Sequence, residues 1–188
     1  MTAPFRNVTA ALALLLCAAP AADAATMVLG GGQAESCYRE ADSGRASRYG
    51  LGICTGALEG DPLTRVDRAA TFVNRGVIYL QRREGKLALA DLESALRLAP
   101  ELGEVHVNRG AALVMLGRYA EGEEALSRGI AIGAKQPQDA YFNRAIAREY
   151  RGDLKGAYHD YVEAQRLAPE WAAPKVELAR FSVSRPGQ

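Results

Sequence analysis

Few residues in this sequence have side chains suited to catalysis or metal binding. The 188-residue chain contains two histidines, His106 and His159, and three cysteines, Cys17, Cys37 and Cys54. Neither histidine lies in a motif with a serine or cysteine nucleophile, and no segment places two histidines at the spacing that a metal site on one helix requires. The sequence therefore predicts a protein that is not an enzyme and that has no cofactor and no metal centre.

The first 24 residues have the order of a secretory signal peptide. Arg6 supplies a positive charge, a predominantly apolar run covers residues 8–19, and small residues flank one variable position at residues 22–24. The run is shorter than the roughly 20 apolar residues of a membrane-spanning helix. We expect cleavage near Ala24 and a periplasmic or secreted mature chain with no integral membrane segment. The alternatives are a buried N-terminal helix and a lipid anchor at Cys17.

Removal of this segment leaves an even number of cysteines, Cys37 and Cys54. An even pair in an oxidising compartment favours a disulfide bond, with two buried free thiols as the alternative. We interpret the pair as a structural staple, because redox cysteines are closely spaced and exposed.

The composition is that of a folded domain with a balanced charge. Hydrophobic residues make up 48% of the chain, which is enough for a packed core. Lysine and arginine number 23 against 22 aspartates and glutamates, giving a formal net charge of +1. This balance argues against a broad nucleic-acid-binding surface, which needs a clustered excess of basic residues.

The rest of the chain repeats itself. Asn74-Arg75-Gly76 recurs 34 residues later as Asn108-Arg109-Gly110, and a further 35 residues later as Asn143-Arg144-Ala145. A second marker, Leu-Ala-Pro, ends at Pro100 and again at Pro169. Each unit shows an amphipathic helical stripe, a break that contains glycine, a second stripe and, in two of the units, a closing proline. The period predicts a stack of helical hairpins.

These residues resemble the tetratricopeptide repeat (TPR) family, whose unit is a 34-residue helical hairpin with a characteristic set of aromatic, small and proline positions. The first full unit fills that set with Phe72, Gly76, Tyr79, Ala88, Ala95 and Pro100. The second unit departs at three of these positions, and the third has Arg148 where the family has tyrosine. The resemblance implies an all-α fold, a right-handed superhelix (solenoid) of antiparallel helix hairpins.

The resemblance also sets the expected domain boundaries. A repeat domain over residues 36–183 follows a flexible N-terminal segment (25–35) and precedes a C-terminal tail (184–188). Its parts are a degenerate repeat (31–64), three full repeats (69–102, 103–137 and 138–171) and a capping helix (170–183). We expect residues 65–68 to lengthen the first helix of the first full repeat, with Thr64 as its N-cap. In the family's hairpin the positions of Cys37 and Cys54 face each other.

Arginines recur at one position of the repeat. Arg75 and Arg144 each precede an aspartate by 16 residues, Asp91 and Asp160, whereas Arg109 has Ala125 at that distance. We interpret the two pairs as structural ion pairs between helices; a ligand-binding arginine ladder is the alternative.

In this family the first helices of the repeats line a concave groove. Carried over to this sequence, the resemblance gives a predominantly apolar candidate groove for a peptide or protein: Val73, Val77, Leu80, Glu104, Val107, Ala111, Val114, Met115, Phe142, Ile146, Glu149 and Tyr150. The basic residues with which some members clamp a C-terminal carboxylate are absent from the matching positions. The alternative is that the chain itself covers these residues, for example with the apolar segment 26–29.

The resemblance therefore predicts an exported scaffold that mediates protein–protein interaction through an apolar groove. A self-associating structural protein of the cell envelope is the alternative function, and a homo-oligomer is possible under either one. Neither prediction involves nucleic acid.

Overall fold

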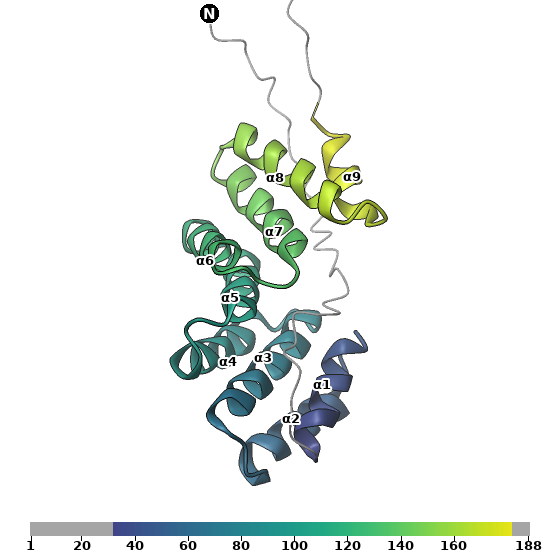
Figure 1. The fold of residues 1–188 in the computed structure, drawn as a ribbon. Helices are drawn as coiled ribbons and strands as arrows, with labels where there is room; N and C mark the ends of the chain where they lie inside the picture. The colour runs from purple at the N-terminus through teal and green to yellow at the C-terminus, as the bar shows by residue number, and fades with distance from the viewer. Residues whose placement is uncertain (1–31, 182–188) are drawn as a thin grey trace, which may run out of the picture.

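The computed structural model of the chain describes residues 32–181 (Figure 1). Within them the chain forms nine α-helices and no strand. Eight helices pair into four antiparallel hairpins, and a short ninth helix follows. The helices are α1 (Gln33–Asp42), α2 (Arg48–Gly60), α3 (Arg65–Gln81), α4 (Gly85–Leu98), α5 (Gly103–Met115), α6 (Tyr119–Ile132), α7 (Pro137–Tyr150), α8 (Leu154–Leu167) and α9 (Ala172–Leu178).

The hairpins stack one after another, so that the chain passes from α1 and α2 at one end to α8 and α9 at the other (Figure 1). Each second helix packs on the first helix of the next hairpin, and the first helices α1, α3, α5 and α7 also contact one another in order. This is the all-α solenoid that the repeats predict. The expected signal peptide and the C-terminal tail lie outside the described residues.

Small residues allow the two helices of a hairpin to approach closely. A Cβ atom added to Gly76 would lie 3.1 Å from Cγ of Leu92, and one added to Gly110 would lie 2.4 Å from Cγ of Leu126. Both leucines are fully buried. The repeated small positions therefore create holes that the large side chains of the facing helix fill.

The first full hairpin begins one turn earlier than the others, as expected from the insertion. Helix α3 starts at Arg65, and Oγ1 of Thr64 accepts a hydrogen bond from the backbone N–H of Asp67 at 3.1 Å. This N-cap satisfies one of the free donors at the helix start and fixes where the helix begins.

The degenerate first unit is a complete hairpin, closed by the Cys37–Cys54 disulfide with a Cα–Cα distance of 4.7 Å. Both cysteines are fully buried in the cluster that contains Val73 of α3. Helix α1 begins at Gln33, inside the segment expected to be flexible up to residue 35. A carboxylate explains the difference, because Oδ2 of Asp61 accepts a hydrogen bond from the backbone N–H of Ala34 at 3.1 Å.

The C-terminal cap is shorter than the expected helix over residues 170–183, of which the last two lie outside the described residues. Helix α9 spans seven residues, and the extended backbone of Trp171 marks its start. The indole ring of Trp171 lies 4.7 Å from the ring of Phe142, which also contacts Tyr161 at 5.5 Å between centroids. The cap therefore covers the apolar surface of α7 and α8.

Candidate functional site

Two of the three recurring arginines, Arg75 and Arg144, each connect three helices. In the first full repeat, Nε and Nη2 of Arg75 donate to the two carboxylate oxygens of Asp91 at 2.7 and 2.8 Å. Nη1 of the same guanidinium donates to Oγ1 of Thr55 on the preceding hairpin at 3.0 Å. The bidentate hydrogen bonds to Asp91 raise the pKa of Arg75, although partial burial of the guanidinium opposes the shift.

The third repeat reproduces this arrangement. Arg144 donates twice to Asp160 at 2.8 Å and once to Oγ of Ser127 at 3.0 Å. Arg148 adds a third bond to Asp160 at 2.9 Å and reaches Glu123 of α6 at 3.0 Å. Asp91 and Asp160 are 6% and 4% exposed, so the two predicted ion pairs lie inside the stack and fix the spacing of its helices.

The middle repeat lacks the carboxylate. Arg109 occupies the same position on α5, but residue 125 is a buried alanine. The Nε atom of Arg109 is buried and has no hydrogen-bond acceptor among the described residues. The arginine series is therefore a structural brace with an incomplete middle member.

Half of the candidate groove residues are buried under neighbouring helices. Val73 and Val77 belong to the cluster that holds Cys37 and Ala41 of α1, and Phe142 lies under the cap at Trp171. The remaining buried members are Glu104, Val107 and Val114. These six side chains therefore expose little surface to a partner.

Glu104 and Glu149 are also occupied by polar contacts within the chain. Oε1 of Glu104 accepts a hydrogen bond from the backbone N–H of Lys135 at 3.2 Å. Glu149 accepts from the hydroxyl of Tyr161 at 3.2 Å and pairs with Arg180 beyond α9. These carboxylates stabilise the α6–α7 turn and the C-terminal cap.

The other candidate residues remain partly open to solvent, and they share positions near the C-terminal ends of the first helices. We call them the groove strip: Leu80, Ala111, Met115, Ile146 and Tyr150. Tyr150 is its most open member, at 42% exposure. The strip is apolar and lies next to the turns within the hairpins.

An aromatic stack extends the groove strip, and the repeat pattern gave no sign of it. The rings of Tyr119 and Tyr150 lie parallel, 4.3 Å apart and inclined by 8°. Partial burial and the neighbouring Tyr150 raise the pKa of the Tyr119 hydroxyl. Tyr119 starts a second helix, which the family pattern does not place on the groove, so its position comes only from the packing of α6 against α7.

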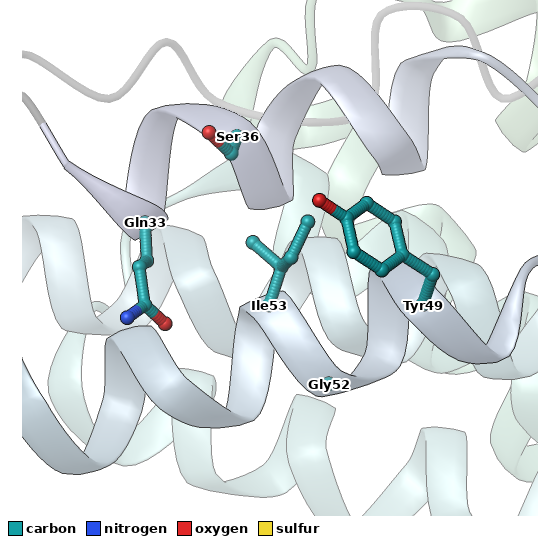
Figure 2. Close-up of a pocket in the computed structure, with 5 residues that line it drawn as sticks. All are labelled: Gln33, Ser36, Tyr49, Gly52 and Ile53. Atoms are coloured by element: carbon teal, nitrogen blue, oxygen red, sulfur yellow. The ribbon is translucent and has the colours of Figure 1, made fainter.

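A shallow pocket lies on the open end of the stack, on the outer face of α1 and α2 (Figure 2). Its volume is about 520 Å³, and its lining residues are Gln33, Ser36, Tyr49, Gly52 and Ile53. Among the described residues, no lysine, arginine, aspartate, glutamate or histidine lines it, so they supply hydroxyl and amide groups but no charge.

The described residues supply no group of three or more histidine, cysteine, aspartate or glutamate side chains placed to hold a metal ion. The described helices are also too short or too polar for any of them to cross a bilayer.

Comparison with known proteins identifies the fold. No family model matches the sequence, and no curated protein matches it significantly. Solved structures do match. The TPR domain of Arabidopsis OM64 aligns with a TM-score of 0.59 at 23% identity, over 62% of this chain and 96% of that domain.

Two longer matches cover most of the described helices. A thermophilic TPR protein of Thermus thermophilus aligns with a TM-score of 0.63 at 18% identity, over 78% of each chain. MamA aligns with a TM-score of 0.62 at 17% identity, over 80% of this chain and 82% of its own. The chain therefore has the fold of TPR proteins, which confirms the resemblance seen in the sequence.

Proposed function

We propose that the protein is an exported, non-catalytic scaffold that binds a protein or peptide partner through the groove strip. The observation that carries this proposal is the stack of the half-buried Tyr119 of α6 on Tyr150, the most exposed member of the apolar strip. Rigid aromatic side chains at a surface contribute a large contact area at little entropic cost, and tyrosine is enriched at interfaces. The TPR fold of the solved neighbours supports an interaction function.

The chemistry of the groove strip suits an apolar partner. Glu149, the acidic candidate residue nearest to the strip, is paired with Arg180 and bonded to Tyr161. An amphipathic helix or an extended apolar segment would therefore bury apolar surface there without stranding an uncompensated charge. The signal-like order of residues 1–24 and the Cys37–Cys54 disulfide support export to an oxidising compartment.

A crosslinking pull-down from the native envelope fraction tests the partner site. We compare the wild type with a Met115→Ser plus Tyr150→Ser variant, and use Val162→Ser on the exposed face of α8 as the matched control. We expect the double variant to lose partners that the control retains, while circular dichroism shows that all three proteins are folded. Capture of the same partners by all three would refute the assignment to the groove strip.

Two further measurements separate the components of the proposal. Mass spectrometry of the mature N-terminus, together with cell fractionation, tests export; an uncut chain in the cytoplasm would refute it. Size-exclusion chromatography with light scattering tests self-association, and a dimer that the double variant converts to a monomer would make a second copy the partner.

A further inference from the structure

The charges of this nearly neutral chain are distributed unevenly between the two edges of the stack. Because the hairpins stack with the same orientation, the turns within hairpins line one edge and the turns between hairpins line the other. The turns within hairpins (42–48, 82–86, 116–121 and 151–155) contain eight basic and four acidic residues. The turns between hairpins (60–65, 98–103, 132–137 and 167–172) contain two basic and three acidic residues.

The basic excess is greatest where the first two turns meet. Nη1 of Arg82 donates to the backbone carbonyl of Ala46 at 3.1 Å, which holds the α1–α2 turn against the α3–α4 turn. Four exposed basic residues lie within four positions of this contact along the chain, and we call them the basic edge: Arg45, Arg48, Arg83 and Lys86. Among the described residues, no carboxylate lies within ion-pair distance of Arg48 or Lys86.

Arg83 occupies a backbone position that favours glycine. Its φ is +63°, and the equivalent residues of the next two hairpins are Gly117 and Gly152, with φ of +75° and +86°. The three turns have the same hydrogen bonds, since the N–H of each of these residues bonds the carbonyl three residues earlier at 3.0 Å. A side chain here carries backbone strain that glycine avoids.

Two exposed apolar residues directly follow two of these charges in the sequence. Tyr49 follows Arg48 and is 73% exposed, and Leu87 follows Lys86 and is 50% exposed. Basic residues interspersed with aromatic and aliphatic tips are the composition of surfaces that rest on the headgroup region of a bilayer. Tyr49 and Leu87 come from different helices, α2 and α4, so they would contact such a surface at separate points.

We propose that the basic edge docks on the surface of an anionic phospholipid bilayer. Arg48 and Lys86 bind lipid phosphates, Arg45 and Arg83 add positive charge beside them, and Tyr49 and Leu87 enter the headgroup layer. An acidic protein segment would also complement the charges, but it would give no role to the two apolar tips. The proposal does not depend on the groove strip.

Vesicle binding tests the proposal. Residues 25–188, which retain all the described helices, are sedimented with vesicles rich in phosphatidylglycerol or with vesicles of phosphatidylcholine alone. We expect binding to the anionic vesicles only, and less of it as salt is added. Arg48→Gln plus Lys86→Gln should weaken binding about fivefold per charge removed. The matched control, Arg65→Gln plus Lys135→Gln on the opposite edge, should bind as the wild type does.

Arg83→Gly provides a second, independent measurement. Loss of the side chain should weaken vesicle binding, and relief of the strained φ should raise the thermal midpoint. A lower thermal midpoint would show that Arg83 is kept for stability and would overturn that part of the argument. Equal binding to both vesicle types, equal weakening by the two double variants, or binding to polyglutamate but not to vesicles would overturn the proposal itself.

Discussion

The ion-pair interpretation can be tested by giving Arg109 the aspartate partner that Arg75 and Arg144 already have. In the first and third repeats the arginine and its aspartate are 16 residues apart, on the facing helices of one hairpin. Ala125 occupies that place for Arg109 and is 3% exposed. Ala125→Asp therefore places a carboxylate where two other hairpins of the same molecule hold one, opposite a guanidinium whose Nε has no acceptor among the described residues.

The expected magnitude follows from the natural pairs. Two hydrogen bonds between charged groups contribute about 1.5–3 kcal/mol each. Against this stand the desolvation of a buried carboxylate, several kcal/mol, and the lower helix propensity of aspartate, about 0.5 kcal/mol. Ala125→Asp should therefore change the free energy of unfolding by about 1 kcal/mol or less. In an Arg109→Met background the same change should cost about 3 kcal/mol, because the carboxylate is buried without a partner.

Urea unfolding of the four proteins in this double-mutant cycle gives the coupling energy, which we expect to be about 3 kcal/mol. Arg75→Met is the reference: it should cost about 3 kcal/mol because it strands Asp91, whereas Arg109→Met alone should be nearly neutral. A coupling energy near zero would show that the middle hairpin does not reproduce the geometry of its neighbours. An Arg109→Met loss as large as that of Arg75→Met would show that Arg109 is already paired.

Four further predictions concern stability. Burial raises the pKa of Tyr161, so the unfolded state ionises first and the free energy of unfolding should fall as the pH rises above about 10; urea titrations should show a smaller fall for Tyr161→Phe. Replacing Cys37 and Cys54 with alanine should lower the free energy of unfolding by about 3 kcal/mol, with increased hydrogen exchange in α1 and α2. The Cβ atom that Gly52→Ala adds meets nothing within 4 Å. The change should raise the free energy of unfolding by up to about 1 kcal/mol, which a higher thermal midpoint would show. Gly110→Ala places its Cβ 2.4 Å from a leucine carbon of α6 and should cost about 1–3 kcal/mol.

The features that the sequence predicted are those set within one repeat. The 16-residue spacing of Arg75 and Asp91 lies inside one hairpin, so the repeat register alone brings the two side chains together. The same holds for the N-cap at Thr64, which depends on residues three apart. Cys37 and Cys54 are 17 residues apart within one hairpin, and the disulfide joins them.

Features that depend on neighbouring units could not be predicted in the same way. The stack of Tyr119 on Tyr150 depends on how two hairpins pack. Within the first unit, the early start of α1 was also missed, because it depends on a hydrogen bond to Asp61, 27 residues away, and not on the repeat positions. The groove residues were taken from a family pattern that specifies which positions face inward. That pattern does not specify whether a terminal helix covers them, as α1 does at Val73 and the cap does at Phe142.

In this short stack only some groove positions are exposed, and these positions connect the two proposed surfaces, the groove strip and the basic edge. The first helices fill the deeper groove positions with one another, so the exposed positions are those near their C-terminal ends, such as Met115 and Tyr150. The turns within the hairpins follow directly, and the basic edge lies in the first two of these turns. A partner on the groove strip would therefore lie close to a bilayer at the basic edge. Arg48→Gln plus Lys86→Gln should separate the two interactions, because it removes charges from the edge and leaves every residue of the strip in place; loss of both interactions in that variant would show that they share one surface.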